Sequence, residues 1–321
     1  MIVYVTGGAG FLGSHLCDRL LAEGHQVVAF DNFVTGSRRN LAAALATGRC
    51  TLIEADVSEP LDLRTLASDE RKPQLIMHFA SPASPVDYGA DPIGTLRVNA
   101  FGTAHLCTLA KQTGARFFLA STSESYGDPL EHPQRETYWG NVNPVGMRAC
   151  YDEAKRFAEA YVTSAVRALG IDGRVVRIFN TYGPRMQPGD GRVIPNFCMA
   201  ALRGEPLTIY GDGTQTRSFC YVDDLIDGIV RFAFAPDAAG AVINIGNPNE
   251  FTIAELANIV AETFGVPLTF EPRPLPPDDP TRRKPDITRA RERLGWEPHV
   301  DLRTGLARTI ASFRSDALVS R

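Results

Sequence analysis

The sequence contains no apolar stretch long enough to cross a membrane and no apolar leader at its start. A membrane-spanning helix needs roughly 18 or more consecutive apolar residues, whereas charged residues, proline and glycine interrupt every apolar run of this chain. Residues 2–5 already form a strand-like run, which differs from the charged and then apolar pattern of a signal peptide. We therefore expect a cytoplasmic protein that does not bind membranes.

Clustered cysteines are also missing. The chain has no Cys-x-x-Cys pair, and its six cysteines are scattered at Cys17, Cys50, Cys107, Cys150, Cys198 and Cys220. A disulfide framework or a structural zinc site requires closer and more regular spacing. We expect reduced thiols and no metal.

No run of basic residues is long enough to follow a phosphate backbone. The net charge is -4, from 33 Lys and Arg against 37 Asp and Glu. Nucleic acid is therefore not an expected partner, and any anionic ligand must be held by a local site. The sequence does have 44% hydrophobic residues over 321 positions, which is enough for a large core.

Short strand-like runs alternate with helix-like segments over the first 180 residues. The runs of β-branched and aromatic residues lie at 2–5, 26–30, 51–54, 75–79, 116–120 and 174–179. Such alternation is typical of an α/β protein in which helices cover both faces of a parallel sheet. The sequence therefore predicts a Rossmann-type, doubly wound fold.

The composition of the sequence changes after residue 180, where stretches rich in proline and glycine separate the expected short strands and helices. We predict a dinucleotide-binding domain over residues 1–180, to which the chain returns at about 222–246. Residues 181–221 and 247–321 are expected to form a smaller α+β lobe that binds the substrate. The proline-rich segment 272–285 is interpreted as an ordered loop rather than a linker.

Gly7, Gly10 and Gly13 lie directly between the first expected strand and the first expected helix. This spacing allows a tight turn, lets backbone N–H groups approach a pyrophosphate, and directs a helix N-terminus toward its negative charge. Asp31 closes the second strand, where a carboxylate accepts hydrogen bonds from the adenosine ribose and repels a 2'-phosphate. The pattern predicts NAD as the cofactor.

Arg38 and Arg39 argue for NADP, but they lie several residues beyond the strand end. Further residues are assigned to the cofactor because they lie in the glycine turn or at the ends of strands that meet at one edge of the sheet. They are Phe11, Leu12, Asn32, Asp56, Val57, Phe79, Ala80 and Ser81.

Tyr151 and Lys155 lie four residues apart, on one face of an expected helix. A lysine cation and the positive nicotinamide ring lower the pKa of the phenol, which can then take a proton from a sugar hydroxyl. Lys155 can also hold the nicotinamide ribose. Thr122 follows an apolar strand, and its hydroxyl can bridge the substrate oxygen and the tyrosine.

These motifs resemble those of the extended short-chain dehydrogenase/reductases, a family of nucleotide-sugar epimerases, dehydratases and decarboxylases. The resemblance is closest to the members that decarboxylate UDP-glucuronic acid. The segments that carry it are 78–85, 121–124, 148–153, 178–181, 183–186, 190–193, 215–217 and 283–286. It implies oxidation of the sugar at C4 by NAD, loss of CO2, and reduction of the keto intermediate to UDP-xylose.

The resemblance also assigns residues to the substrate. Glu124 manages a proton near C5, and Arg283 orients the sugar carboxylate and assists protonation of the enolate. The remaining contacts with the nucleotide sugar fall to Ser84, Arg97, Asn180, Arg192, Tyr210 and Arg217. Arginines suit this role because the guanidinium binds phosphate in a bidentate manner.

Two positions depart from the family pattern. Arg97 stands where lysine is common and keeps the charge needed to meet an anionic group. Ser125 stands where valine is usual and adds a hydroxyl beside Glu124. We hypothesise that Ser125 lets some UDP-4-keto-pentose escape before the hydride returns.

Other interpretations stay open. A nucleotide-sugar 4-epimerase or 4,6-dehydratase would use the same Tyr151, Lys155 and NAD without decarboxylation. A non-catalytic, regulatory NAD-binding protein could be built on the same fold.

Helices expected at 99–113 and 149–168 have apolar faces. Family members pair these helices in a four-helix interface, so we expect a homodimer.

Overall fold

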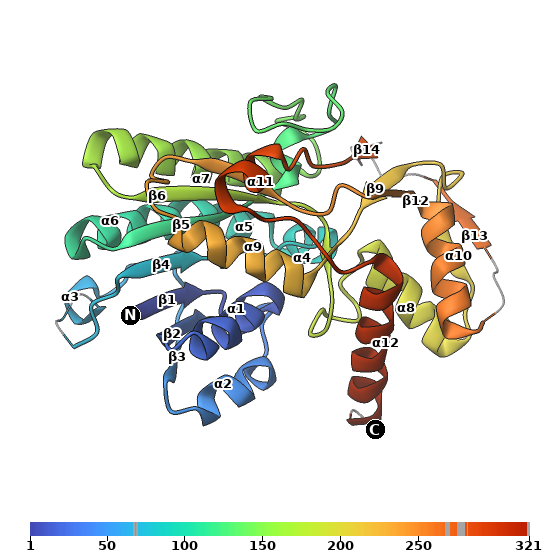
Figure 1. Ribbon diagram of the computed structural model, residues 1–321, viewed down its shortest axis with the longest axis horizontal. Helices are drawn as coiled ribbons and strands as arrows, with labels where there is room; N and C mark the ends of the chain where they lie inside the picture. The colour runs from blue at the N-terminus through green and yellow to red at the C-terminus, as the bar shows by residue number, and fades with distance from the viewer. Residues whose placement is uncertain (67, 69, 267–269, 275–279, 281, 320–321) are drawn as a thin grey trace.

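A seven-stranded parallel sheet forms the centre of the computed structural model, which describes residues 1–66, 68, 70–266, 270–274, 280 and 282–319 (Figure 1). The strand order is β11-β6-β5-β4-β1-β2-β3, and every neighbouring pair is parallel. The strands are β1 (Ile2–Thr6), β2 (Gln26–Asp31), β3 (Cys50–Glu54), β4 (Leu75–His78), β5 (Arg116–Thr122), β6 (Gly173–Ile178) and β11 (Val242–Ile245). This confirms the predicted α/β, Rossmann-type fold.

Helices cover both faces of the sheet, because each presents an apolar stripe at helical spacing. One face carries α1 (Phe11–Ala22), η1 (Arg38–Leu41), α2 (Ala42–Ala46) and α9 (Val222–Phe234). The other face carries α3 (Leu63–Leu66), α6 (Thr103–Thr113) and α7 (Ala149–Leu169). Three segments precede α6: α4 (Pro85–Ala90), α5 (Pro92–Arg97) and the π-helical η2 (Val98–Gly102). Fully buried side chains on these helices include Leu16, Leu20, Ile229, Phe232, Leu109, Ala158 and Val162.

The direction of the chain reverses between β1 and β4. From β1 it proceeds outward through β2 and β3, and from β4 it proceeds the other way through β5 and β6 to β11. Ligands of such sheets bind in the crevice that this reversal opens beyond the carboxyl ends of the strands. The segments that follow β1, β2, β4, β5 and β6 therefore meet in one place.

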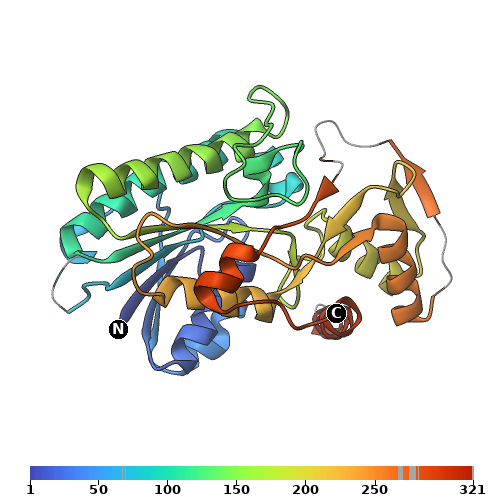
Figure 2. The same cartoon turned by 45° about the horizontal axis from the view of Figure 1, so that its top comes forward.

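A second lobe lies beside the seven-stranded sheet. Figure 2 shows its helices α8, α10 and α12 to one side of that sheet. Its helices are α8 (Val193–Arg203), α10 (Ile253–Phe264) and α12 (Leu302–Val319). Its strands are β8 (Leu207–Tyr210), paired with β13 (Phe270–Arg273), and β9 (Thr216–Ser218), which lies between β12 (Glu250–Thr252) and β14 (Arg282–Arg283). β7 (Thr181–Tyr182) and β10 (Cys220–Tyr221) pair where the chain passes between the lobes.

The predicted domain limits need one correction. β11 and α9 come from the segment that we expected to return to the first domain. However, α11 (Thr288–Leu294) also packs against β11 and α9, although we assigned residues 247–321 to the lobe. The reason is apolar burial: Trp296 is 2% exposed, and its indole Nε1 donates a hydrogen bond to the Asp224 carbonyl at 3.0 Å. Within the proline-rich segment, residues 275–279 and 281 lie outside the described residues.

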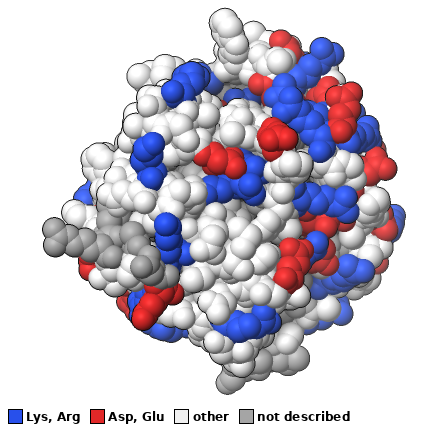
Figure 3. Space-filling view, turned by 60° about the vertical axis from the view of Figure 1, so that its left-hand side comes forward, with Lys and Arg blue, Asp and Glu red and all other residues white. Residues whose placement is uncertain are grey.

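Positive and negative side chains are interspersed on the face of the molecule shown in Figure 3. Ion pairs on the surface of the molecule include Arg38 with Glu54 and Arg19 with Asp227. No described helix combines the length and the apolar character that a membrane crossing requires.

The two tryptophans of the chain provide a test of how α11 and the following residues are anchored. We expect Trp296→Ala to lower the free energy of unfolding by about 3–5 kcal/mol, because it removes a fully buried side chain. Trp139 is 89% exposed, so Trp139→Ala should change the stability by no more than about 0.5 kcal/mol. Denaturant unfolding followed by circular dichroism compares the variants. Equal losses of stability would contradict this packing.

Candidate active site

A cavity of about 740 Å³ opens at the carboxyl edge of the sheet and is closed on one side by the second lobe. It is lined by the predicted site residues whose side chains are described. These are Gly7, Gly10, Phe11, Leu12, Gly13, Asp31, Asn32, Asp56, Val57, Phe79, Ala80, Ser81, Ser84, Arg97, Thr122, Glu124, Tyr151, Lys155, Asn180, Arg192, Arg217 and Arg283. The side chain of Tyr210, also predicted, lies outside the described part of the chain.

The glycine turn between β1 and α1 is too closely packed for larger residues and open toward the cavity. A Cβ atom on Gly13 would lie 2.0 Å from the Gly7 carbonyl oxygen, and Gly7 itself has φ +69°. A Cβ on Gly10 would meet a single atom within 4 Å, the Gly7 carbonyl oxygen at 3.2 Å, so Gly10 borders open space. α1 begins at the next residue without a side-chain cap. The turn therefore has the shape and the N–H groups that a pyrophosphate needs.

Asp31 at the end of β2 is buried and lines the cavity. Its carboxylate accepts hydrogen bonds from the backbone N–H groups of Ala9 and Phe33, both at 2.8 Å. Burial raises the pKa of Asp31, and these backbone donors act in the opposite direction. Arg38 donates to Glu54 at 2.7 Å and does not line the cavity. The buried carboxylate of Asp31 therefore fits the ribose of NAD, and Arg38 is held away from it by Glu54.

Arg97 lines the cavity near Asp56, a residue predicted for the cofactor, and its contact with the substrate stays a prediction. Its guanidinium pairs with Glu59 at 2.5 Å. Asn32 donates to Asp56 at 3.1 Å. Burial acts to raise the pKa of Asp56, but hydrogen bonds from Ser58 and the charge of Arg97 lower it overall. Because α5 directs Arg97 toward the end of β3, it lies with the residues predicted for the adenosine.

Tyr151 and Lys155 are buried on the same face of α7, next to the end of β5. Lys155 Nζ donates to the Ala120 carbonyl at 3.0 Å and lies 5.8 Å from the centre of the Tyr151 ring. Burial lowers the pKa of Lys155 to about 7, against the opposing charge of Glu159. Burial raises the pKa of Tyr151, and a hydrogen bond with Thr122 lowers it in part. The predicted lowering by a neighbouring cation stays a prediction for the cofactor-bound protein.

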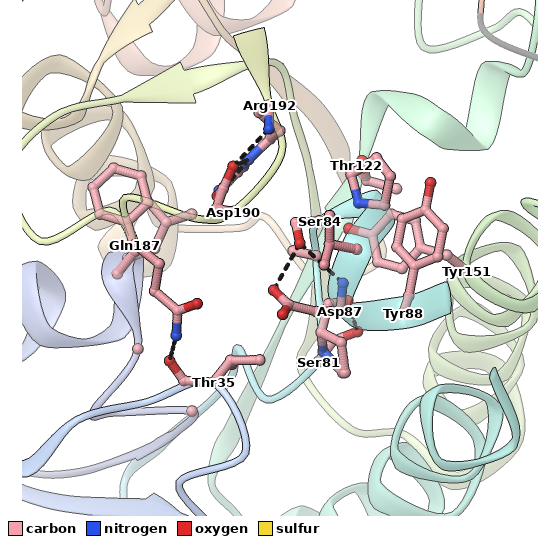
Figure 4. Close-up of a pocket in the computed structure, with 18 of the residues that line it drawn as sticks. Thr35, Ser81, Ser84, Asp87, Tyr88, Thr122, Tyr151, Gln187, Asp190 and Arg192 are labelled. Carbon is pink, nitrogen blue, oxygen red and sulfur yellow. Dashed lines mark hydrogen bonds and ion pairs between the residues drawn. The ribbon is translucent and has the colours of Figure 1, made fainter. Parts of the chain in front are cut away.

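Tyr88 is a site residue that sequence reasoning missed. Its ring stacks on that of Tyr151, with centres 5.0 Å apart and planes at 7°, and Figure 4 shows both rings beside Thr122. Tyr88 belongs to α4, which Ser84 caps: the Ser84 hydroxyl accepts from the Asp87 N–H at 3.1 Å and donates to the Asp87 carboxylate at 2.7 Å. No spacing in the sequence links Tyr88 with Tyr151, because only the tertiary fold brings α4 to α7.

Glu124 is held between two arginines that come from different parts of the chain. Arg283 on β14 donates from both terminal nitrogens to the two carboxylate oxygens, each at 2.7 Å. Arg148 at the start of α7 also pairs with the carboxylate at 2.7 Å. Burial would raise the pKa of Glu124, but the charges of Arg283 and Arg148 outweigh it and lower the pKa to about 2. Arg148 was not predicted, although it lies only one turn of helix before Tyr151.

Arg283 keeps one donor for a ligand. Its Nε is buried and donates no hydrogen bond to any residue in the described ranges. A buried N–H group without a partner costs about 1–3 kcal/mol, which an acceptor in the cavity would offset. An anionic group bound there would therefore lie beside Glu124.

The other predicted substrate residues approach the cavity from separate segments. The Arg192 Nε donates to the Asp190 carboxylate at 2.8 and 3.0 Å, and Figure 4 shows this pair on a different wall from Tyr151. Arg217 lies opposite Arg283 in the β9–β14 register. Asn180, after β6, accepts a long hydrogen bond from Arg283 at 3.5 Å.

Ser125 does not face the site, contrary to our expectation. Its hydroxyl is buried beside α7, where it donates to Glu159 at 3.2 Å and lies 3.3 Å from the Ser121 hydroxyl. The reason is that Glu159, held by Arg177, attracts both hydroxyls. Among the residues that the structure describes, no group of His, Cys, Asp and Glu is placed to hold a metal ion.

A dinucleotide-binding sheet with a tyrosine and a lysine at its carboxyl edge is the arrangement of an enzyme that oxidises and reduces a substrate hydroxyl. Residues 3–246 match the NAD dependent epimerase/dehydratase family, and the chain belongs to this family.

Similar proteins of this family include sugar-nucleotide enzymes from plants, animals and bacteria. The chain is 51% identical to UDP-glucuronic acid decarboxylase 1 of Arabidopsis thaliana, over 98% of this chain and 70% of that protein. It is 48% identical to UDP-glucuronic acid decarboxylase 1 of Xenopus tropicalis, over 98% and 72%. Its structure resembles UDP-glucuronic acid 4-epimerase of Bacillus cereus, crystallised with UDP-glucuronic acid and NAD, with a TM-score of 0.89 at 29% identity, covering 98% and 99% of the two chains.

The glycine turn can be tested by adding a single methyl group. We expect Gly13→Ala to weaken NAD binding at least tenfold, since its Cβ would displace the Gly7 carbonyl. Gly89→Ala is the matched control, because a Cβ there meets no atom within 4 Å. Calorimetric titration with NAD measures both. Unchanged affinity in Gly13→Ala would show that the cofactor does not depend on this turn.

Proposed function

We propose that this protein decarboxylates UDP-glucuronic acid with the help of NAD and releases UDP-xylose and CO2. The observation that carries the proposal is the position of Glu124 between Arg283 and Arg148, next to the buried Tyr151. Relatives at about half identity over nearly the whole chain are named UDP-glucuronic acid decarboxylases, which supports the same activity.

Tyr151, Thr122 and Lys155 act on the C4 hydroxyl of the sugar. NAD held by the glycine turn and Asp31 would supply the acceptor for the C4 hydride and the donor for its return. Tyr151 takes the proton of the hydroxyl, and Thr122 holds the phenol and the sugar oxygen in line. Lys155, fixed by the Ala120 carbonyl, holds the nicotinamide ribose and favours the phenolate when it is charged.

Arg283 positions the sugar carboxylate for its loss as CO2. A ketone at C4 makes this carboxylate β to a carbonyl, so that the electrons of the breaking bond pass into an enolate. The buried Nε of Arg283 offers a donor to one carboxylate oxygen. Glu124 lies beside this position and handles the proton that goes to C5.

The uridine diphosphate would lie toward the second lobe. Arg192 and Arg217 bring two guanidinium groups from separate segments to this part of the cavity, and Asn180 adds an amide. Ser84 at the start of α4 faces the sugar. Arginine suits these contacts because its planar fork matches two phosphate oxygens.

The alternative activities would require fewer of the residues in this site. A 4-epimerase or a 4,6-dehydratase needs Tyr151 and Lys155 but no pair of arginines on one carboxylate. A regulatory NAD-binding protein would need none of Thr122, Tyr151 and Lys155, all of which line the cavity. Release of UDP-4-keto-pentose loses its proposed cause, because Ser125 faces Glu159. We therefore propose UDP-xylose as the main product.

Replacing the phenol tests the reaction. With carboxyl-labelled UDP-glucuronic acid, we expect the protein to release labelled CO2, and Tyr151→Phe to release it about 10²–10⁴-fold more slowly, because the general base is lost. Tyr161→Phe removes a hydroxyl from the same helix and should keep the parent rate. Mass spectrometry identifies the sugar product. Undiminished release by Tyr151→Phe would refute the mechanism, and an epimer without CO2 would refute the activity.

We further propose that two copies of the chain pair through α5, η2 and α7 as a homodimer. Large apolar side chains are exposed on these neighbouring elements, at Ile93, Leu96, Phe101 and Phe157. Several large apolar side chains exposed on elements that pack together are typical of a protein interface.

A charge placed in this surface tests the dimer. We expect Phe157→Glu to shift the protein from dimer to monomer in sedimentation experiments, because pairing would bury the new carboxylate. Leu130→Glu adds the same charge at an exposed loop position outside these helices and should leave the dimer intact. A parent protein that sediments as a monomer would exclude this assembly.

A further inference from the structure

A second cavity, of about 240 Å³, lies behind Arg148. Its walls come from the loop after η3 (Ser123–Tyr126) and from the start of α7: Gly127, Asp128, Asn141, Val142, Asn143, Arg148 and Asp152. Arg148 also lines the main cavity. Arg148, which pairs with Glu124, therefore lies between the main cavity and the second cavity.

Asp152 is the buried carboxylate of this second cavity. It lies one helical turn after Arg148 and directly after Tyr151, and it is 6% exposed. Its Oδ1 is buried and accepts no hydrogen bond from the residues that the structure describes. An ionised carboxylate in this position is costly, because burial penalises charge and an oxygen lacks a donor. The geometry therefore favours a carboxyl group that holds a proton.

The charges around Asp152 act in both directions. Burial and the negative charge of Glu124 raise the pKa of Asp152 to about 7, while Arg148 and Arg283 oppose them. The neighbouring titratable and charged groups come from η3, α4, β14, the cavity loop and α7 itself. They are Glu124, Tyr88, Arg283, Asp128, Arg148, Cys150, Tyr151 and Glu153.

Decarboxylation consumes one proton in each turnover. The bond between C5 and the carboxyl carbon breaks, CO2 leaves, its electron pair passes into the enolate, and a new C–H bond forms at C5. The proton that Tyr151 takes from the C4 hydroxyl returns to that oxygen when the hydride returns, so it is not available for C5. Glu124, whose pKa lies near 2, carries no proton at neutral pH. The proton must enter from elsewhere.

We propose that Asp152 holds this proton and passes it to Glu124 beside Arg148, and that the second cavity reloads Asp152 from solvent. This inference rests on the proposed decarboxylation. Glu124 receives the proton as CO2 leaves and gives it to C5, so that both carboxylates end the cycle in their starting states once Asp152 has taken a new proton from water. Asp152 is thus a positioning residue for a proton, without contact with the sugar.

Charge balance explains when Asp152 takes up the proton. Without substrate, the cluster holds the positive charges of Arg148 and Arg283 against Glu124 and, when ionised, Asp152. The sugar carboxylate adds a further negative charge to this buried region. Protonation of Asp152 restores neutrality, so binding of a carboxylated sugar should draw a proton from solution.

Calorimetry can count this proton. Titrations at pH 8 use two buffers of different ionisation enthalpy and a Tyr151→Phe background, in which turnover is slowed about 10²–10⁴-fold. They compare UDP-glucuronic acid with UDP-glucose, which lacks the carboxylate. We expect uptake of about one more proton with UDP-glucuronic acid. Adding Asp152→Asn should abolish the difference, and adding Glu153→Gln, the neighbouring carboxylate, should leave it. An unchanged difference in Asp152→Asn overturns the inference.

Turnover provides the second readout. In the otherwise native enzyme, we expect Asp152→Asn to lower the kcat for CO2 release at least tenfold, with little change in KM, and Asp152→Glu to restore most of it because the proton-holding group returns. Equal loss in Asp152→Glu and Asp152→Asn would indicate a structural role alone. A parent enzyme that releases no CO2 would refute the proposed function, whereas normal kcat in Asp152→Asn would refute only this route.

Discussion

The site depends most on the ion pair between Glu124 and Arg283. It joins η3, directly after β5, to β14 of the second lobe, across 159 positions of the chain. Burying two charges is costly, and a pair offsets that cost only with good geometry. Two donor–acceptor contacts of 2.7 Å, with Arg148 on the same carboxylate, provide it. Without Arg283, Glu124 would keep a single cation, and the lobe would lose one of its contacts with the sheet.

The same cluster sets the electrostatics of the cavity. Two guanidinium groups on one carboxylate leave positive charge where a sugar carboxylate must bind, and burial strengthens each of these interactions. The hydride-transfer group lies beside it: Tyr151, Thr122 and Lys155 are positioned by α7 and the end of β5. One helix therefore supplies both centres, since Arg148 and Asp152 flank Tyr151 on α7. In the proton route that we propose, the proton-holding Asp152 is therefore a neighbour of the general base on one helix.

Local sequence patterns predicted the parts of the structure that depend on neighbouring residues. The glycine turn, the strand ends with Asp31 and Thr122, and the Tyr151–Lys155 pair all follow from spacing along a single element. What the sequence could not predict depends on tertiary contacts. Tyr88 reaches Tyr151 only through the packing of α4, Arg97 is drawn to Glu59, and Ser125 is drawn to the pair of Glu159 with Arg177. We assigned α11 to the wrong lobe because α9, the helix against which it packs, is distant in sequence.

The bidentate contact of Arg283 allows the most direct test of this account. Arg283→Lys keeps the charge but removes the fork that holds Glu124 and the buried Nε, which donates no hydrogen bond to the described residues. With carboxyl-labelled UDP-glucuronic acid, release of labelled CO2 should fall at least about 100-fold while the affinity for NAD stays the same. Release at the parent rate from Arg283→Lys would contradict the central role given to this ion pair.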